Sequence, residues 1–370
     1  MNFNFFAPTR IVFGSGKLTE TGKFARALSS TAVVVCGSSA LSLGYVERVR
    51  ASLATAGVSC HVVSGIASDP KSLDVDRIVD IARQTGAGVL VGIGGGSVLD
   101  ATKAAGVAVS YSSAGPLVGR TLEPNAHDLP VIAVPTTAGT GAEVTKGAII
   151  FDEARRLKSG VRGEGLFPKV AIVDPDLLRT MPRDVMAETV FDAITHAVES
   201  YVCRQATPIS MALSEKALAL LGDCIAKGLD LTDPDIRARL ALGALIGGLN
   251  VGTVSSCLPH RIQQAMGSIR SPSCSHARGL ALVYRGWLNS AYPFASDRFN
   301  RIGEIFGARD ACTAIEAILE KLGITSRLSE AGFTAKHFPE ILTNITGNIE
   351  NDPIDAIDSG KIEKILEAAL

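Results

Sequence analysis

The chain has 370 residues, and because a single hydrophobic core stops growing at roughly 250–300 residues, two domains are expected. Hydrophobic residues make up 46% of the chain and charged residues 20%, a composition that excludes a largely disordered protein. The formal net charge is -1 and no long run of Lys or Arg is present, so the chain has no general attraction to nucleic acid or anionic membranes. Small molecules are the expected partners.

Targeting signals and disulfides are not expected. The N-terminal residues MNFNFFAPTR lack the basic and long apolar segments of a signal peptide, and no window offers the roughly 20 uninterrupted apolar residues of a membrane span. The seven cysteines include no C-x-x-C pair, and most lie in apolar surroundings such as VVVCG, which is typical of free thiols in a reducing compartment. We therefore expect a cytoplasmic protein.

Short apolar runs alternate with helical patterns in the first half of the chain. Continuous runs of this kind predict strands that are buried on both faces, here at residues 31–37, 60–66, 88–96, 131–137 and 170–175. Between them, stretches such as GYVERVRASLATAG have an apolar period of 3.6 residues and end in Gly, as helices often do. The alternation predicts a parallel sheet wrapped by helices, in a Rossmann-like α/β domain.

The second half of the chain has helical patterns only. Helices are predicted from about Asp184 onward, over residues 184–204, 208–228, 234–252, 255–267, 277–290, 296–306, 312–323 and 355–369. The segment VDPDLLRTMPRDV contains two prolines and marks the seam between the two parts. We therefore predict an α/β domain over residues 1–180 and an all-α domain over residues 181–370.

A glycine-rich loop, GIGGGSVLDATK at residues 92–103, follows a predicted strand and opens a predicted helix. Because Gly94, Gly95 and Gly96 have no Cβ, their N–H groups can approach a phosphate while the helix presents its positive N-terminal end. Phosphate binding is the functional interpretation, and a glycine-rich turn needed only for packing is the alternative. The loop is not a G-x-G-x-x-G motif of a first strand, because it follows the third predicted strand.

A threonine-rich loop, PTTAGTGAEVTKGA at residues 135–148, follows the next predicted strand. Its hydroxyls come from Thr136, Thr137 and Thr140, at the carboxyl edge of the sheet where open α/β folds bind ligands. Taken alone the loop is equally well interpreted as a Thr/Gly-rich turn. Beside the glycine-rich loop it favours a nucleotide site.

The stretch FDAITHAVES at residues 191–200 carries Asp192 and His196 four residues apart. On a helix these positions lie on one face, so a carboxylate and an imidazole point into one space, as metal ligands do. An isolated D-x-x-x-H is more often a surface ion pair, so this spacing needs support from its context.

These motifs, with the stretch from Lys158 through Pro168 to Asp174–Pro175, are together similar to the iron-containing (group III) alcohol dehydrogenase family. The resemblance runs from the opening PTRIVFGSG to about residue 290. It implies a dehydroquinate synthase-like fold, with a dinucleotide-binding α/β domain and a helical domain that binds metal and substrate. It further implies hydride transfer between NAD(P)H and a carbonyl held on a divalent metal, Fe²⁺ or, less commonly, Zn²⁺.

The resemblance also implies the site residues. Four metal ligands are expected, namely Asp192, His196, His260 and His276; His260 is taken as the third because Gly267 follows it by seven residues. Gly94, Gly95, Gly96 and Ser97 would hold the pyrophosphate, with Asp100 supporting that loop. The rest of the dinucleotide site would be lined by Thr136, Thr137, Thr140, Lys158 and Leu178.

The chain departs from the family pattern near the third ligand. Gln264 stands where many members have a second histidine, and a glutamine can donate a hydrogen bond but cannot titrate near neutral pH. We place it as the catalytic-site residue in that position. The segment between Gly267 and His276 is also two residues longer than is common in the family, which makes His276 the least secure ligand.

Three arginines, Arg261, Arg270 and Arg278, crowd this region. Their expected place is a solvated helix surface; if one faces the substrate instead, its planar fork suits a carboxylate or phosphate. After the first long strand the chain reads Gly37-Ser38-Ser39, where NAD-preferring relatives commonly carry an Asp after the strand. Without an acidic residue to repel a 2′-phosphate, NADP(H) should be accepted.

The sequence thus predicts an NAD(P)-dependent alcohol dehydrogenase or carbonyl reductase with a small alcohol or aldehyde as substrate. A homodimer or larger homo-oligomer is a family-level expectation. Three alternatives stay open: a metal-independent reductase of an anionic carbonyl resembling maleylacetate reductase, a dehydroquinate-synthase-like lyase, and a catalytically inactive nucleotide-binding relative. The threonine-rich loop argues against the lyase, and the four ligand types argue against the other two.

Overall fold

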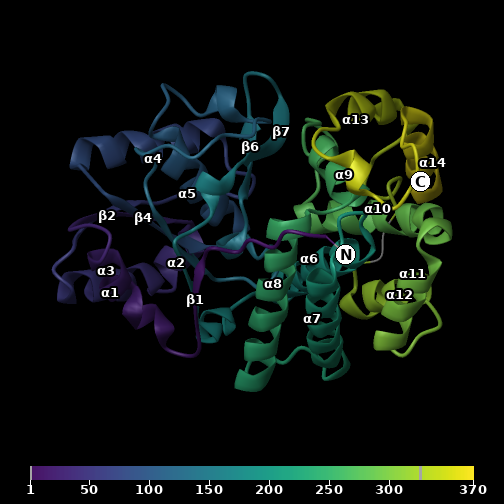
Figure 1. Ribbon diagram of the computed structural model, residues 1–370, viewed down its shortest axis with the longest axis horizontal. Coiled ribbons are helices and arrows are strands. Elements are labelled where there is room, and N and C mark those ends of the chain that lie inside the picture. The colour runs from purple at the N-terminus through teal and green to yellow at the C-terminus, as the bar shows by residue number, and fades with distance from the viewer. Residues whose placement is uncertain (1, 325–326) are drawn as a thin grey trace. The chain divides into compact units, whose positions relative to one another are not determined.

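The computed structural model describes residues 2–324 and 327–370, which form two compact units (Figure 1). One unit comprises residues 6–181 and 231–241, and the other comprises residues 2–5, 182–230 and 242–370. The segment 231–241 groups with the α/β unit although the sequence places it in the helical part. Its Arg237 donates to Asp176 Oδ1 at 3.0 Å and to the carbonyls of Leu231 and Thr232.

A six-stranded parallel sheet forms the centre of the first unit, in the order β1-β8-β5-β4-β2-β3. Successive residues of a strand point to opposite faces, so Val33 and Val35 join one apolar core while Val34 and Cys36 join another. The strands are β1 (Arg10–Phe13), β2 (Thr31–Cys36), β3 (Ser59–Val63), β4 (Val89–Gly94), β5 (Val131–Pro135) and β8 (Val170–Val173).

Helices cover both faces of this sheet. Apolar residues of α4 (Ser72–Thr85) and α5 (Gly96–Ala108) pack on one face (Figure 1). The other face is covered by residues of α1 (Thr21–Arg26), α2 (Ser38–Ser42) and α3 (Tyr45–Thr55). The predicted Rossmann-like parallel sheet is therefore confirmed, as are all five predicted strands to within a few residues.

Three strands were not predicted. The edge strand β1 has only four residues, RIVF, and half of them are exposed. The hairpin strands β6 (Gly147–Asp152) and β7 (Leu157–Arg162) pair antiparallel outside the main sheet, and β7 reads LKSGVR, which has no apolar run. Because β1 precedes the first predicted strand, the glycine-rich loop follows the fourth strand of the chain and not the third.

The second unit is all helical, as predicted. Its helices are α6 (Arg183–Val202), α7 (Pro208–Ala226), α8 (Pro234–Val254, whose first turns lie in the α/β unit), α9 (Leu258–Met266), α10 (His276–Ala291), α11 (Ser296–Ile305), α12 (Ala311–Leu322), α13 (Phe338–Asn344) and α14 (Ser359–Ala369). The short α13 was not predicted. No single described helix is long and apolar enough to span a membrane; α8 and α9 together reach that length and composition but are bent by 96°.

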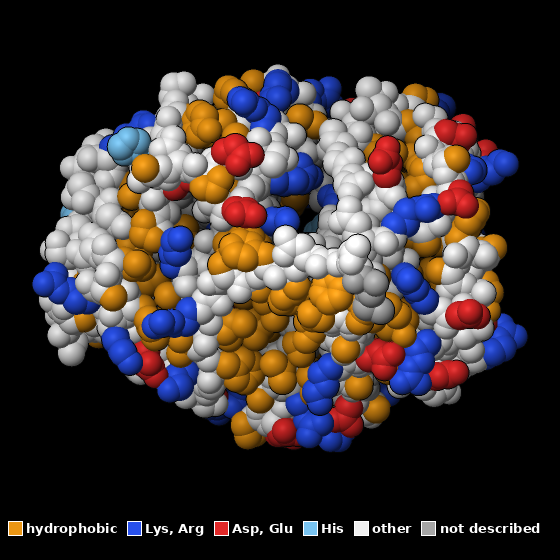
Figure 2. All heavy atoms as spheres, viewed as in Figure 1, with side chains coloured by type: hydrophobic (Ala, Val, Ile, Leu, Met, Phe, Trp, Pro, Cys, Tyr) orange, Lys and Arg blue, Asp and Glu red, His pale blue; other side chains and the backbone are white. Residues whose placement is uncertain are grey.

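The face of the molecule seen in Figure 2 carries side chains of both charge signs. Figure 2 shows Lys and Arg side chains interspersed with Asp and Glu over the visible face. All seven cysteines are free thiols, and Cys36, Cys203, Cys224 and Cys257 are buried.

Candidate functional site

Helix α6 supplies the first half of a buried polar cluster. Asp192, His196 and Glu199 are spaced i, i+4 and i+7, so they lie on one face of the helix. They are 2%, 4% and 0% exposed, although most of the neighbouring α6 residues are apolar and buried as well. A helix buried on nearly all sides thus carries two carboxylates and an imidazole into the interior of the helical unit.

The N-terminus of α9 brings His260 to the same place. The N–H of Cys257 donates to Glu199 Oε2 at 2.7 Å, and the N–H of Leu258 donates to Asp352 Oδ2 at 2.8 Å. These carboxylates satisfy N–H groups that have no partner inside the helix and complement its positive end. They therefore determine where the first turn of α9, and with it His260, lies.

Helix α10 begins with His276. Its N-cap, Ser275, accepts from the N–H of Arg278, and the Ser275 hydroxyl donates to Glu188 Oε2 at 2.7 Å. Arg278 pairs with the other oxygen of Glu188 at 2.7 Å. Because Glu188 lies on α6, this network ties the start of α10 to the helix that carries Asp192.

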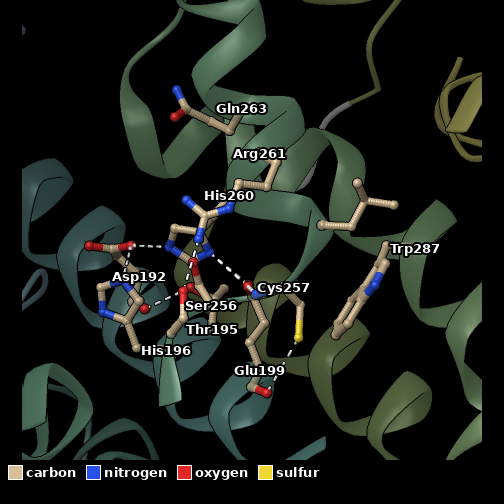
Figure 3. Close-up of polar contacts among 12 residues, drawn as sticks. Asp192, Thr195, His196, Glu199, Ser256, Cys257, His260, Arg261, Gln263 and Trp287 are labelled. Atoms are coloured by element: carbon tan, nitrogen blue, oxygen red, sulfur yellow. Dashed lines mark hydrogen bonds and ion pairs between the residues drawn. The ribbon is translucent and has the colours of Figure 1, made fainter. Parts of the chain in front are cut away.

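The three imidazoles converge on one carboxylate oxygen. Nε2 of His196, His260 and His276 lies 3.7, 3.7 and 3.5 Å from Asp192 Oδ1. The rings of His196 and His260 are stacked with centroids 4.8 Å apart. Figure 3 shows Asp192, His196 and His260 facing one another. The ligand atoms of these three buried residues lie within 4.8 Å of one another, close enough to hold one metal ion.

A second layer of residues orients the imidazoles. His260 Nδ1 lies 2.8 Å from Glu199 Oε2, and because a carboxylate only accepts, Nδ1 carries a proton and Nε2 is the nitrogen left to bind a cation. His276 Nδ1 is similarly bonded to Gln263 Oε1. Carboxylate and amide oxygens behind metal-binding histidines commonly hold the tautomer in this way.

The cluster fits a divalent cation. Asp192 Oδ1 and His260 Nε2 are buried and have no hydrogen-bond partner, an arrangement that is costly for polar atoms unless a cation lies between them. One carboxylate and three imidazoles form the donor set that Fe²⁺ and Zn²⁺ accept. The residues expected to bind metal are thus brought together at one point.

Protonation states in the cluster also fit metal binding. Burial alone would raise the pKa of the Asp192 carboxyl, but His196 and His276 hold it well below its usual range. Burial lowers the pKa of His196 to about 4. Burial also disfavours the His260 imidazolium, yet Glu199 and Asp192 outweigh it and raise the pKa of His260 to about 9. The ionised carboxylate and the neutral His196 are both in the form that ligands need, whereas His260 must release its Nε2 proton when an ion binds.

In the α/β unit, the glycine-rich loop lies at the point where the strand order reverses. The chain leaves β2 to β3 on one side and returns to β4 on the other, so the carboxyl ends of β2 and β4 adjoin. Gly37, Ser38 and Ser39 follow β2, while Gly94 ends β4 and Gly95 and Gly96 follow it. Ligands of doubly wound folds bind at this switch point.

The threonine-rich loop packs directly on the glycines. A Cβ on Gly96 would lie 2.6 Å from Thr140 Cγ2, and one on Gly95 would lie 3.4 Å from Thr137. The N–H of Thr136 donates to the carbonyl of Gly94 at 2.9 Å. The two loops therefore form one surface at the N-terminus of α5, in which an added side chain at position 96 would clash with Thr140.

The remaining residues predicted for the dinucleotide lie around these loops. Ser97 Oγ accepts from the N–H of Asp69 at 3.3 Å, and Asp100 Oδ2 accepts from the N–H of Ile149 in β6 at 2.9 Å. Lys158, in β7, pairs with Asp69 Oδ1 at 2.6 Å. Leu178 is buried in a short 3-10 helix, Pro175–Leu178, that follows β8.

The three arginines fall into two classes. Arg270 and Arg278 are exposed, as predicted for a solvated helix surface. For Arg261 that prediction is wrong, because it is only 5% exposed and lies on α9 directly after His260. Gln264, also 5% exposed, lies one turn further along α9, with Oε1 3.5 Å from Arg261 Nη1.

Sequence reasoning missed Glu199 and Gln263. Each lies three residues after a predicted ligand, His196 and His260 respectively, which is the spacing of neighbours on a helix. That signal alone is weak, because the partner of each is a histidine on a different helix.

Known proteins resemble the chain over its whole length. The model of the iron-containing alcohol dehydrogenase family matches residues 8–175, and the model of the C-terminal domain of the Fe-containing alcohol dehydrogenase family matches residues 186–370. An NAD-dependent methanol dehydrogenase of Bacillus methanolicus is 30% identical over 89% of each chain. A lactaldehyde reductase of Escherichia coli K12 is 29% identical over 88% of this chain and 87% of its own.

The fold is likewise found among solved structures. An alcohol dehydrogenase from a halo-thermophilic archaeon of a Red Sea brine pool matches with a TM-score of 0.94 and 26% identity, over 100% of this chain and 99% of its own. Together with the family models, these matches show an oxidoreductase of alcohols and aldehydes. The chain belongs to the iron-containing alcohol dehydrogenase family.

Proposed function

We propose that the protein is a metal-dependent alcohol dehydrogenase or carbonyl reductase that uses NAD(P)(H). The observation that carries the proposal is the convergence of three imidazole Nε2 atoms on Asp192 Oδ1. Asp192 Oδ1 and His260 Nε2 are buried there without a hydrogen-bond partner, so these side chains are arranged to bind a cation and not one another.

Asp192, His196, His260 and His276 would hold the cation, with Fe²⁺ the first candidate and Zn²⁺ the second. When bound, a divalent cation supplies Lewis acidity that stabilises negative charge developing on a substrate oxygen. Glu199 and Gln263 bind Nδ1 of His260 and His276, so that Nε2 of each ring faces the cation site, and the buried surroundings exclude water. Gln264 is proposed to donate a hydrogen bond in the position where many relatives have a histidine.

The dinucleotide is proposed to bind in the α/β unit, where it would donate or accept the hydride. Gly94, Gly95, Gly96 and Ser97 suit the pyrophosphate, because the glycines leave N–H groups open at the start of the 13-residue helix α5. Asp100 ties α5 to β6 and so holds that helix in place. Thr136, Thr137, Thr140, Lys158 and Leu178 would line the rest.

NADP(H) is the proposed preference. Gly37, Ser38 and Ser39 at the end of β2 place no carboxylate where it would repel a 2′-phosphate. Arg48, a basic residue on the following helix α3, has its guanidinium 6.0 Å from the Tyr45 ring centroid. A homodimer or larger homo-oligomer is expected from the family.

The test begins with protein purified without oxygen, stripped of metal and reloaded with Fe²⁺ or Zn²⁺. Oxidation of NADPH and NADH is then followed with neutral and anionic aldehydes. We expect turnover only after reloading, and expect Asp192→Asn to retain neither bound metal nor turnover. Equal turnover with and without metal would instead indicate a metal-independent reductase, and dinucleotide binding without any turnover would indicate an inactive relative.

A further inference from the structure

Arg261 is a buried cation without a counter-ion. It is 5% exposed, and no described residue forms an ion pair with it. Arginine is rarely buried to this degree unless it is paired, because a charge removed from water must be compensated. Since α9 carries His260 in the position directly before it, this uncompensated charge lies beside the metal centre.

Its observed partners are neutral. Nη2 donates to Ser255 Oγ at 3.0 Å, and Nη1 contacts Gln264 Oε1 at 3.5 Å. Nε is buried and donates to no atom. A hydroxyl and an amide accept hydrogen bonds but leave the charge uncancelled, and the planar fork of the guanidinium retains unused donors.

The nearby carboxylates are engaged elsewhere. Glu199 accepts from His260 Nδ1 and from the N–H of Cys257. Asp352 accepts from the N–H groups of Leu258 and Ile354 and from Trp287 Nε1. Burial lowers the pKa of Arg261 by more than Glu199 raises it, as expected for a guanidinium that is short of a counter-ion.

A second donor lies on the same face of α9. Gln264 follows Arg261 by three residues, and its Oε1 already faces the guanidinium, so its amide nitrogen lies nearby. That nitrogen donates to no described residue. A guanidinium and an amide together match the several oxygens of a carboxylate, sulfonate or phosphonate.

We propose that Arg261, with Gln264, binds an anionic group of the substrate, so that the preferred substrates are small aldehydes or ketones that carry one such group. The proposal rests on the proposed function, because the metal centre would hold the carbonyl oxygen of the same molecule whose anionic group Arg261 binds. Arg261 is a specificity-determining residue in this role, since it touches the substrate away from the reacting carbon.

Arg285 provides a matched control. It lies on α10, the helix that begins with the ligand His276, but it is exposed and already paired with Glu316 at 3.0 Å. Arg285→Gln therefore removes an equal charge from another ligand-bearing helix without removing a buried, unpaired guanidinium. Arg261→Lys keeps the charge while losing the fork, and so separates electrostatic attraction from planar recognition.

The first experiment measures binding and needs no turnover. Metal-loaded protein without dinucleotide is titrated calorimetrically with 4-hydroxybutanoate and with 1-butanol, which have the same chain length and differ in charge. We expect the anionic alcohol to bind roughly 10- to 100-fold more tightly, as for a hydrogen-bonded charge pair. Arg261→Gln should abolish this difference, Arg261→Lys should restore part of it, and Arg285→Gln should leave it unchanged.

A second readout uses dinucleotide oxidation with succinic semialdehyde and butanal. In Arg261→Gln the ratio of kcat/KM for the anionic aldehyde to that for the neutral one should fall by a similar factor. Equal binding of the two alcohols by the unaltered protein would overturn the proposal, as would an Arg261→Gln variant that loses both equally. A third outcome is that the protein binds the anionic alcohol selectively through Arg261 but shows no turnover, or turnover that does not depend on metal. That outcome would refute the proposed metal-dependent function and leave the role of Arg261 standing.

Discussion

Glu199 decides which nitrogen of His260 is free to bind a cation. Oε2 accepts from the N–H of Cys257 and lies 2.8 Å from His260 Nδ1, which Oε1 also faces at 2.9 Å, so both the imidazole and the start of α9 depend on Glu199. Glu199→Gln removes the negative charge and replaces one of the two oxygens that face Nδ1 by an amide N–H group. We expect metal affinity to fall about 10- to 100-fold, as is common when such a partner is lost.

Competition with a chelator of known affinity measures this loss. Glu316→Gln is the matched control, because Glu316 is half exposed and forms its ion pair with Arg285 on the surface. If Glu199→Gln and Glu316→Gln held metal equally well, the carboxylate would not control the His260 tautomer.

At the scale of elements, the start of α5 depends on contact between two loops. A Cβ on Gly96 would come within 2.6 Å of Thr140 Cγ2 and 2.8 Å of its Oγ1, closer than real Cβ atoms approach such neighbours. Gly96→Ala should therefore push the threonine-rich loop away and weaken NADPH binding by about tenfold or more, since both loops form the proposed phosphate site.

Fluorescence titration of NADPH checks this expectation. Gly360→Ala serves as control, because a Cβ there meets only an ordinary contact at 3.4 Å, in the helix α14. Metal content should be normal in both variants, since Gly96 lies in a different unit from the four ligands and a Cβ on Gly360 meets only an ordinary contact. Unchanged NADPH affinity in Gly96→Ala would place the dinucleotide elsewhere.

At the scale of the whole molecule, metal should stabilise the folded chain. An ion that binds only the folded state adds about 2.7 kcal/mol at a free concentration of 100 times Kd. We therefore expect Zn²⁺ or Fe²⁺ to raise Tm, and a chelator to lower it, in differential scanning calorimetry. Asp192→Asn should show no metal-dependent shift in Tm. A shift of the same size in that variant would mean that the ion binds at a different site.

Stability should also depend on pH through buried acids. Burial raises the pKa of Glu143 to about 7 and that of Asp352 to about 6. In the unfolded chain these carboxyls ionise near their usual pKa, so between about pH 4.5 and 7 the folded state binds more protons and its stability falls as pH rises.

Urea unfolding at pH 5 and pH 8 measures the effect. For Glu143 we expect a loss on the order of 2 kcal/mol over this interval, which Glu143→Gln should remove because the amide has no charge to bury. A pH dependence that is identical in Glu143→Gln would show that other groups cause it.

Local sequence patterns predicted most of the elements. Continuous apolar runs identified the buried strands β2, β3, β4, β5 and β8, because strands covered on both faces need no polar alternation. The same logic could not find β7, which pairs with β6 outside the main sheet and contains no apolar run, or the four-residue edge strand β1. Such strands are formed by partners far along the chain, and a local window contains no record of those partners.

The sequence by itself determined the chemical inventory of this protein: the glycine-rich and threonine-rich loops, the Asp192–His196 pair on one helical face, and, through resemblance to a family, His260 and His276. Only the tertiary structure showed that all three imidazoles meet Asp192 Oδ1, that Glu199 and Gln263 stand behind them, and that Arg261 is buried unpaired while Arg278 is on the surface. The physical reason is that ligand geometry, burial and charge compensation depend on which helices pack together. Side-chain type and spacing within one helix carry no information about that packing.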